Sequence, residues 1–254
     1  MKIFRKLFLP LFIAATAFPQ QGNTITAAVA ANVQFAMKDI KTAFEKNTGI
    51  KVDVIIGSSG QLTAQIKQGA PFDVFISADM RYPEDLYKNK LAVDSPKVYA
   101  YGALVVWTMN KDIALKNDLS ELTDSKVIKI AVANPKTAPY GTAAIKSLKH
   151  FGLLKNVEGK LVYGESIAST NQFIISGAAD IGFTAKSVVM SSAMKGKGNW
   201  SEVEPSAYNP IRQGCVVLSY GKENHPAASK QFYDFLFSDK VREILKNYGY
   251  KVGF

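Results

Sequence analysis

The stretch GSSGQLTAQIKQG, residues 57–69, follows an apolar, strand-like run at residues 52–56 and opens an amphipathic helix that we predict over residues 62–67,. The first turn of a helix carries backbone N–H groups without intrahelical partners, and the helix dipole is positive there. The glycines let an anion approach these groups closely, and the hydroxyls of Ser58 and Ser59 add two donors,. This stretch therefore predicts a socket for an oxyanion. It carries no GK[ST] sequence, which argues against a nucleoside triphosphate site.

Apolar strands alternate with amphipathic helices along the rest of the chain. The predicted strands span residues 25–30, 52–56, 73–76, 103–108, 128–133, 161–163, 180–183 and 215–219,. The predicted helices span residues 33–46, 62–67, 141–151 and 169–176, with a short helix after Pro83 and two more from about Pro226. Repeated β-α-β units predict an α/β fold in which mostly parallel sheets are flanked by helices.

Four strand-to-helix junctions carry small, polar or glycine residues. They are Ala31-Asn32, Ser58-Ser59-Gly60, the stretch APYG at residues 138–141, and the stretch SIAS at residues 166–169. In open parallel sheets, ligands bind at the carboxyl ends of the strands. Two of these junctions fall in each half of the chain, so two α/β lobes that close on one ligand would bring all four together. The residues alone therefore indicate a two-lobed binder of an oxyanion.

The N-terminal segment has the pattern of a signal peptide. Lys2, Arg5 and Lys6 give a basic start, and an apolar run over residues 7–17 ends in Ala-Thr-Ala, which is typical of a cleavage site,. The run is too short for a comfortable membrane span. We expect a signal peptide and N-terminal extension within residues 1–22, cleavage near residue 17, and export to the periplasm; a retained anchor is the alternative.

Charge and cysteine content narrow the function further. The formal net charge is +10, and loss of the three signal-peptide cations would leave +7. The lysines are scattered rather than gathered into a basic stripe, so we expect no nucleic-acid partner but a mild attraction for anions. The single cysteine, Cys215, excludes an internal disulfide, and its apolar, strand-like surroundings indicate a buried packing residue,.

Two long motifs resemble the periplasmic molybdate-binding proteins of ABC importers. They are SSGQLTAQIKQGAPFDVFISAD, residues 58–79, and AVANPKTAPYGTAA, residues 131–144, and the resemblance extends over residues 25–249. It implies the type II periplasmic-binding fold, with the ligand in a cleft between two lobes. Lobe I would comprise residues 23–101 and 211–254, and lobe II residues 102–210. The hinge would lie near residues 101–102 and 209–212.

The resemblance also implies which groups hold the oxyanion. Ser59 matches a serine at the head of the second helix, with Ser58 beside it. Tyr140 and Ile167 match positions that offer a backbone N–H. Molybdenum would be bound only as the oxyanion, with no direct metal ligands and no other cofactor.

Two positions depart from the common family pattern. The first loop, Ala31-Asn32, often carries a serine in the family; here Asn32 can donate through its side-chain amide and its N–H. A late tyrosine that often contacts the ligand aligns with Ala185, which removes one hydroxyl donor unless Tyr140 or Ser187 compensates.

The chemistry of these loops favours fully ionised dianions. They contain no carboxylate except Glu165, which we expect to point away from the ligand,. Molybdate, tungstate and sulfate need only donors, whereas hydrogen phosphate carries a proton and needs an acceptor. Cavity size would separate sulfate from molybdate, so the preference for molybdate rests on the resemblance alone.

We therefore expect a monomeric, non-enzymatic binding protein that captures molybdate and tungstate and delivers them to a membrane ABC permease. One alternative is a binder of sulfate or thiosulfate, and another is the sensor lobe of a membrane receptor. An exported enzyme acting on an anionic substrate is a third, but Gln61 breaks a G-x-S-x-G elbow,. His150 and His225 have no partners at metal-ligand spacing,. A purely structural alternative makes Ser58 and Ser59 only a helix cap.

Overall fold

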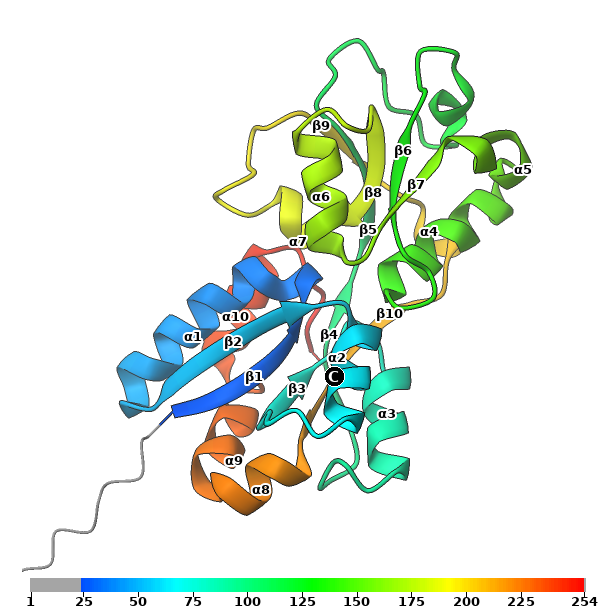
Figure 1. The fold of residues 1–254 in the computed structure, drawn as a ribbon. Coiled ribbons are helices and arrows are strands. Elements are labelled where there is room, and N and C mark those ends of the chain that lie inside the picture. Colours follow the sequence, from blue (N-terminus) through cyan, green and yellow to red (C-terminus); the bar gives the residue numbers. More distant parts are fainter. Residues whose placement is uncertain (1–23, 254) are drawn as a thin grey trace, which may run out of the picture.

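The structure is a computed structural model that describes residues 24–253, so the predicted signal peptide lies outside the described residues. Two five-stranded sheets, each flanked by helices, form two lobes that lie end to end (Figure 1). We call the part built on the first sheet lobe I and the part built on the second sheet lobe II. The α/β two-lobe fold predicted from the sequence is confirmed, whereas the exact lobe boundaries stay a prediction.

Lobe I contains both ends of the described chain. Its strand order is β2-β1-β3-β10-β4. The strands are β1 (Thr24–Ala30), β2 (Lys51–Gly57), β3 (Val74–Ile76), β4 (Lys97–Gly102) and β10 (Ile211–Val217). A 3-10 turn, η1 (Ala31–Val33), follows β1, and the helices are α1 (Gln34–Thr48), α2 (Ser59–Lys67), α3 (Arg81–Lys88), α8 (Ser219–Asn224), α9 (Pro226–Phe235) and α10 (Asp239–Asn247).

Lobe II is one continuous segment between two crossings of the chain. Its strand order is β7-β6-β8-β5-β9. The strands are β5 (Leu104–Thr108), β6 (Ile130–Ala133), β7 (Leu161–Gly164), β8 (Ile181–Ala185) and β9 (Asn199–Glu202). The helices are α4 (Pro139–His150), α5 (Leu154–Val157), α6 (Ile167–Ile175) and α7 (Lys186–Val189), with 3-10 turns η2 (Ser120–Thr123), η3 (Glu158–Lys160) and η4 (Pro205–Ala207).

Both sheets are mixed, which corrects the expectation of mostly parallel sheets. The β-α-β units give parallel pairs, β1 with β2 and β3, and β6 with β7 and β8. In contrast, β10 runs antiparallel to β3 and β4, and β5 runs antiparallel to β8 and β9. The parallel strands end at the edge that faces the other lobe, whereas β5 and β10 start there because they carry the chain across. Their direction is therefore reversed.

Several predicted elements need a shift in their bounds. The last strand, expected at residues 215–219, spans Ile211–Val217, and β4 and β9 were not predicted. Helices α2, α4 and α6 begin two or three residues earlier than expected. Ser58 and Ser166 cap α2 and α6 with their hydroxyls, and Pro139 occupies the first turn of α4, where its missing N–H costs nothing,.

The central strands of each sheet are buried on both faces. In β3, Val74 and Ile76 face the cluster formed with α1, α9 and α10, while Phe75 faces the cluster formed with α2 and α3,. Cys215 is fully buried in the first of these clusters, as predicted, and burial raises the pKa of its thiol. Within residues 24–253, no helix combines the length and apolarity needed to cross a membrane.

A buried carboxylate stabilises the end of lobe I that is remote from lobe II. Asp73 is 1 % exposed, and its Oδ2 accepts a hydrogen bond from the backbone N–H of Thr26 at 2.6 Å. Its Oδ1 lies 2.8 Å from Nδ1 of His225 and 3.4 Å from Oγ of Ser229, which donates to it. His225 thus has a structural partner in the same lobe. The Asp73 carboxylate joins β1, the start of β3 and α9.

We predict that Asp73→Ala lowers the free energy of unfolding by roughly 3 kcal/mol, because it leaves buried donors without an acceptor. Urea denaturation of both proteins measures the change. Asp53→Ala is the matched control, since Asp53 is exposed on the adjacent strand β2 and should change stability by less than about 0.5 kcal/mol,. Equal stability of the two variants would contradict the prediction.

Candidate functional site

A small cavity lies between the lobes at the ends of the parallel strands. Its volume is about 10 Å3, far below the roughly 300–1,000 Å3 of typical sites for organic ligands,. The cavity can therefore hold only a very small ligand. The lining residues are Ala30, Ala31, Asn32, Gly57, Ser58, Ser59, Ala78, Ala138, Pro139, Tyr140 and Ile167. The structure thus brings together all six residues predicted from the sequence: Ala31, Asn32, Ser58, Ser59, Tyr140 and Ile167.

Three helices begin at this cavity. Ser59 is the first residue of α2 and Ile167 the first residue of α6. Tyr140 is the second residue of α4, and its N–H is the first that the helix can offer because Pro139 has none,. These N–H groups have no acceptor within their own helices, and the positive ends of three helix dipoles meet here. The backbone alone therefore favours an anion.

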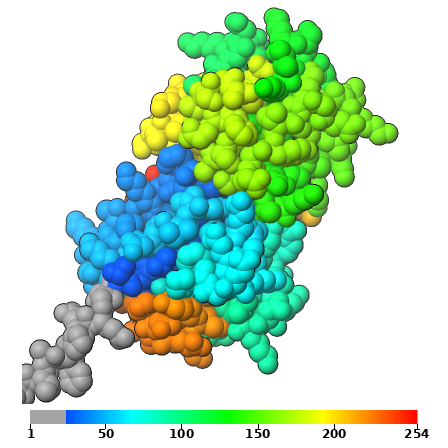
Figure 2. All heavy atoms as spheres, in the orientation of Figure 1, coloured from blue at the N-terminus to red at the C-terminus, as the bar shows by residue number. Residues whose placement is uncertain are grey.

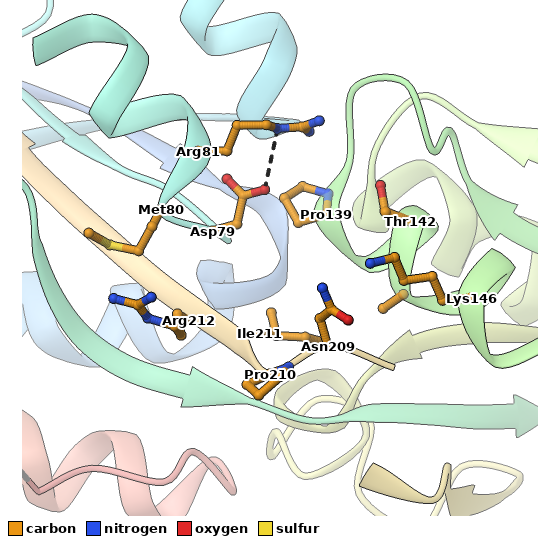
Figure 3. A pocket seen from close by; sticks show the side chains of 11 residues that line it. Asp79, Met80, Arg81, Pro139, Thr142, Lys146, Asn209, Pro210, Ile211 and Arg212 are labelled. Atoms are coloured by element: carbon orange, nitrogen blue, oxygen red, sulfur yellow. Dashed lines mark ion pairs between the residues drawn. The ribbon is translucent and has the colours of Figure 1, made fainter. Parts of the chain in front are cut away.

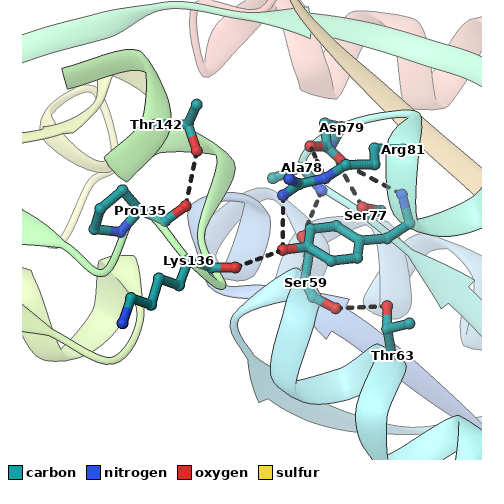
Figure 4. A network of polar contacts seen from close by, with 10 residues as sticks. Ser59, Thr63, Ser77, Ala78, Asp79, Arg81, Pro135, Lys136 and Thr142 are labelled. Atoms are coloured by element: carbon teal, nitrogen blue, oxygen red, sulfur yellow. Dashed lines mark hydrogen bonds and ion pairs between the residues drawn. The ribbon is translucent and has the colours of Figure 1, made fainter. Parts of the chain in front are cut away.

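Ser59 is the side chain best prepared to donate to a ligand. It is 1 % exposed, and its Oγ accepts a hydrogen bond from the backbone N–H of Ala78 at 3.0 Å (Figure 4). Because the oxygen is the acceptor in this bond, the hydroxyl proton remains available. Thr63 donates to the carbonyl oxygen of Ser59 at 2.8 Å and holds the first turn of α2 in place.

Ser58 has a different role. Its Oγ accepts from the N–H of Gln61 at 3.3 Å and donates to Oε1 of Gln61 at 3.0 Å, and its own N–H reaches the same Oε1 at 3.4 Å. These bonds form a capping box that satisfies the backbone N–H and the hydroxyl of Ser58,. The structure therefore separates the two serines: Ser58 caps α2, and Ser59 leaves a donor for the cavity.

Asn32 does not offer its side-chain amide to the cavity, contrary to our expectation. Both Nδ2 hydrogens are used, one toward Oε1 of Gln213 at 2.8 Å and one toward the Tyr250 hydroxyl at 3.0 Å. The Oδ1 atom has no hydrogen-bond partner among the described residues. Asn32 can therefore contribute only its backbone N–H as a donor.

Ser187 does not take the place of the family tyrosine at Ala185, because its hydroxyl proton is already used. Ala185 is buried and does not line the cavity. Ser187 donates its hydroxyl to the carbonyl oxygen of Asn32 at 2.7 Å, and the Tyr140 hydroxyl accepts from Nε2 of Gln213 at 3.2 Å. Burial raises the pKa of Tyr140 well above its usual value, so this hydroxyl stays neutral.

Negative charge is kept out of the cavity. No Asp or Glu belongs to the residues that line it. Glu165 is exposed, as expected, and its Oε2 accepts from Nε2 of Gln61 at 3.2 Å. Within residues 24–253, no group of three or more His, Cys, Asp or Glu side chains could hold a metal ion.

The two lobes are in contact around the cavity, and the face seen in Figure 2 shows lobe I meeting lobe II. The N–H of Gly60 donates to the carbonyl oxygen of Thr137 at 2.8 Å, and the Tyr82 hydroxyl donates to that of Lys136 at 3.3 Å. With the bond between Gln61 and Glu165, these contacts form a rim of hydrogen bonds between the lobes. The structure is therefore a closed state.

A larger cavity of about 310 Å3 lies beside the crossing strands (Figure 3). It shares only Pro139 with the small cavity. Asp79 and Arg81 line it and form an ion pair at 3.7 Å, and burial raises the pKa of the Asp79 carboxyl. Its lining carries one carboxylate, Asp79, and three cations, Arg81, Lys146 and Arg212, so its charge also suits anions, but its volume is far larger than a small dianion needs.

Sequence reasoning missed the residues that hold the site loops from behind. Gln213 and Tyr250 contact Asn32 but line no wall of the small cavity. One signal was present in the sequence: Gln213 is a polar residue next to the apolar run of β10. Tyr250 gave no signal, because its contact with Asn32 joins opposite ends of the described chain.

Comparison with known proteins agrees with this architecture. Residues 25–251 match the family model described as bacterial extracellular solute-binding protein. The molybdate-binding protein ModA of Azotobacter vinelandii is 40% identical, with 96% of each chain covered. ModA of Rhodobacter capsulatus is 38% identical, covering 94% of this chain and 92% of its own.

Among solved structures, the periplasmic molybdate-binding protein of Azotobacter vinelandii superimposes with a TM-score of 0.85 and 32% sequence identity. The match covers 91% of this chain and 100% of that chain. The family match over residues 25–251 and the similarity to these relatives show which family the chain belongs to. It belongs to the family of bacterial extracellular solute-binding proteins.

Proposed function

We propose that this protein captures molybdate, and tungstate with it, outside the cytoplasm and delivers the ion to the permease of an ABC importer. The observation that carries the proposal is the small closed cavity whose polar lining presents helix N-termini and the Ser59 hydroxyl, with no lining carboxylate. The relatives from Azotobacter vinelandii and Rhodobacter capsulatus are molybdate-binding proteins, which supports the choice of ion. Export by the N-terminal segment, a periplasmic location and a monomeric state belong to the same proposal.

The donor set explains how a dianion would be held. The candidate donors are the hydroxyl and N–H of Ser59 and the N–H groups of Asn32, Tyr140 and Ile167. Each hydrogen bond to a charged group contributes roughly 1.5–3 kcal/mol net, and enclosure between the lobes strengthens it by excluding water. The donors do not titrate near neutral pH, so affinity would depend on the charge of the ligand rather than on that of the protein.

Lobe closure would complete the site. Asn32 and Ser59 belong to lobe I, whereas Tyr140 and Ile167 belong to lobe II. An ion bound to one lobe alone would keep part of its hydration shell and lack the donors of the other lobe. The closed arrangement therefore binds the ion more tightly. The ligand therefore shifts the population toward closure, which is a hinge motion about the crossing strands.

The choice of ligand gives the first test of this proposal. Titration calorimetry of the mature protein should show binding of one molybdate or tungstate ion per chain, at least about tenfold tighter than sulfate, as expected from the molybdate-binding relatives,. Phosphate should bind weakly, since its proton meets no carboxylate. Tight sulfate with weak molybdate would keep the site and overturn the choice of ion. The absence of binding by every oxyanion would overturn the proposal.

The hydroxyl of Ser59 gives a second test of the proposal. Ser59→Ala should weaken molybdate binding by about 10- to 100-fold, because one charge-assisted hydrogen bond is lost. Ser191→Ala is the matched control: it also removes a buried hydroxyl, which donates to the carbonyl oxygen of Val188 in lobe II away from the cavity. Its dissociation constant should stay within about twofold of wild type. If both variants bind as wild type does, Ser59 does not contact the ion.

Closure of the two lobes gives a third test of the proposal. A Cβ on Gly60 would lie 2.9 Å from both Cα and O of Thr137, so Gly60→Ala blocks the approach of the lobes. Ligand-free stability should stay the same or rise slightly, since alanine favours a helix by up to about 1 kcal/mol. Molybdate affinity should fall at least about tenfold.

The control for this substitution is Gly159→Ala, because a Cβ there meets no atom within 4 Å. Calorimetry and thermal unfolding of both variants separate closure from folding. Unchanged affinity of Gly60→Ala would show that the contact between Gly60 and Thr137 is not needed for binding.

A further inference from the structure

Six buried polar side chains lie behind the small cavity and join the two lobes. We call them the floor network: Asn32, Tyr99, Tyr140, Ser187, Gln213 and Tyr250. All are 4 % exposed or less, and Gln213 is fully buried. They come from η1, β4, α4, α7, β10 and the segment after α10. Two of them, Asn32 and Tyr140, also line the cavity, whereas the other four do not.

Gln213 is the centre of the floor network. Its Oε1 accepts from Nδ2 of Asn32 at 2.8 Å and from the Tyr99 hydroxyl at 3.1 Å, and its Nε2 donates to the Tyr140 hydroxyl at 3.2 Å. Only this orientation of the amide places its oxygen against two donors. A Cβ at position 102 would lie 2.5 Å from Nε2 of Gln213, so Gly102 leaves the space in which the amide reaches Tyr140.

A second set of bonds holds the Asn32 loop, through Ser187 of lobe II and Tyr250 at the end of lobe I. Ser187 donates to the carbonyl oxygen of Asn32 at 2.7 Å. The Tyr250 hydroxyl accepts from Nδ2 of Asn32 at 3.0 Å and lies 3.1 Å from Oγ of Ser187. Burial raises the pKa values of Tyr99, Tyr140 and Tyr250, so the floor network consists of neutral groups. No charge of the network competes with the ligand.

We propose that Gln213 is a positioning residue that couples oxyanion binding to lobe closure by linking Asn32 of lobe I to Tyr140 of lobe II. This inference rests on the function proposed above. Gln213 touches no ligand atom, since it does not line the cavity. It acts through Asn32 and Tyr140, two residues that line the cavity, one from each lobe. When the bridge is complete, it ties these two lining residues to each other across the lobes.

The Tyr140 hydroxyl offers a sharp test, because its removal leaves the backbone N–H of the same residue in place. Tyr140→Phe and Gln213→Leu should each weaken molybdate binding by about tenfold. The double variant should bind no more weakly than Gln213→Leu alone, because both substitutions break the same bridge. Calorimetry gives the dissociation constants, and urea denaturation without ligand gives the stability of each variant.

The control is Ser229→Ala, which removes a buried hydroxyl from lobe I at the Asp73 cluster. A purely structural role for Gln213 predicts that its variants behave like this control, with lower stability and unchanged affinity. A positioning role predicts loss of affinity that is non-additive between Gln213 and Tyr140.

The series distinguishes this inference from the proposed function. If wild type binds molybdate and Tyr140→Phe binds it equally well, the inference is wrong while the proposed function stands, even when Gln213→Leu does not fold. If the affinity losses of the two single variants add in full, the bridge is not the shared element and the inference is also wrong. Wild-type protein that binds no oxyanion overturns both.

Discussion

The unpaired N–H groups at the first turns of α2, α4 and α6 are the constraint on which the rest of the structure depends. The three first turns must lie near the same point, and their N–H groups must have no acceptor within the protein. The two sheets achieve this because β1, β2, β6 and β7 end at edges that face each other. The strands that carry the chain between lobes, β5 and β10, start at those edges and so run antiparallel to their neighbours. The mixture of parallel and antiparallel strands in each sheet therefore follows from the position of the site between the lobes.

The candidate site is enclosed by two layers of hydrogen bonds between the lobes. The rim contains the bonds from Gly60 to Thr137 and from Gln61 to Glu165, and the floor network centres on Gln213. Both layers use neutral groups or place their one carboxylate at the exposed rim. An enclosed site has a low local dielectric, which strengthens donors and penalises an unmatched charge. A rim and floor of this kind favour a ligand that brings two negative charges and no proton.

Local patterns predicted most of the fold, and distant contacts account for what they missed. The strand predicted at residues 52–56 is β2 at Lys51–Gly57, since alternation of apolar residues and flanking glycines are local signals,. The strands β4 and β9 and the direction of β10 were missed, because each depends on pairing with a strand far along the chain. The six predicted residues could be named because strand-to-helix junctions are local and because the chain resembles a known family, and the structure places them around one small cavity.

The sequence by itself determined which residues stand at the heads of the helices and that no carboxylate other than Glu165 stands among them. Only the tertiary structure decided which of their donors remain free. Ser58 and Ser59 look equivalent in the sequence, yet one closes a capping box and the other accepts from Ala78 and keeps its proton. The Asn32 amide is consumed by Gln213 and Tyr250, residues from the far end of the chain. A hydrogen bond needs its partner within about 3 Å, and folding alone sets that distance between residues far apart in the chain.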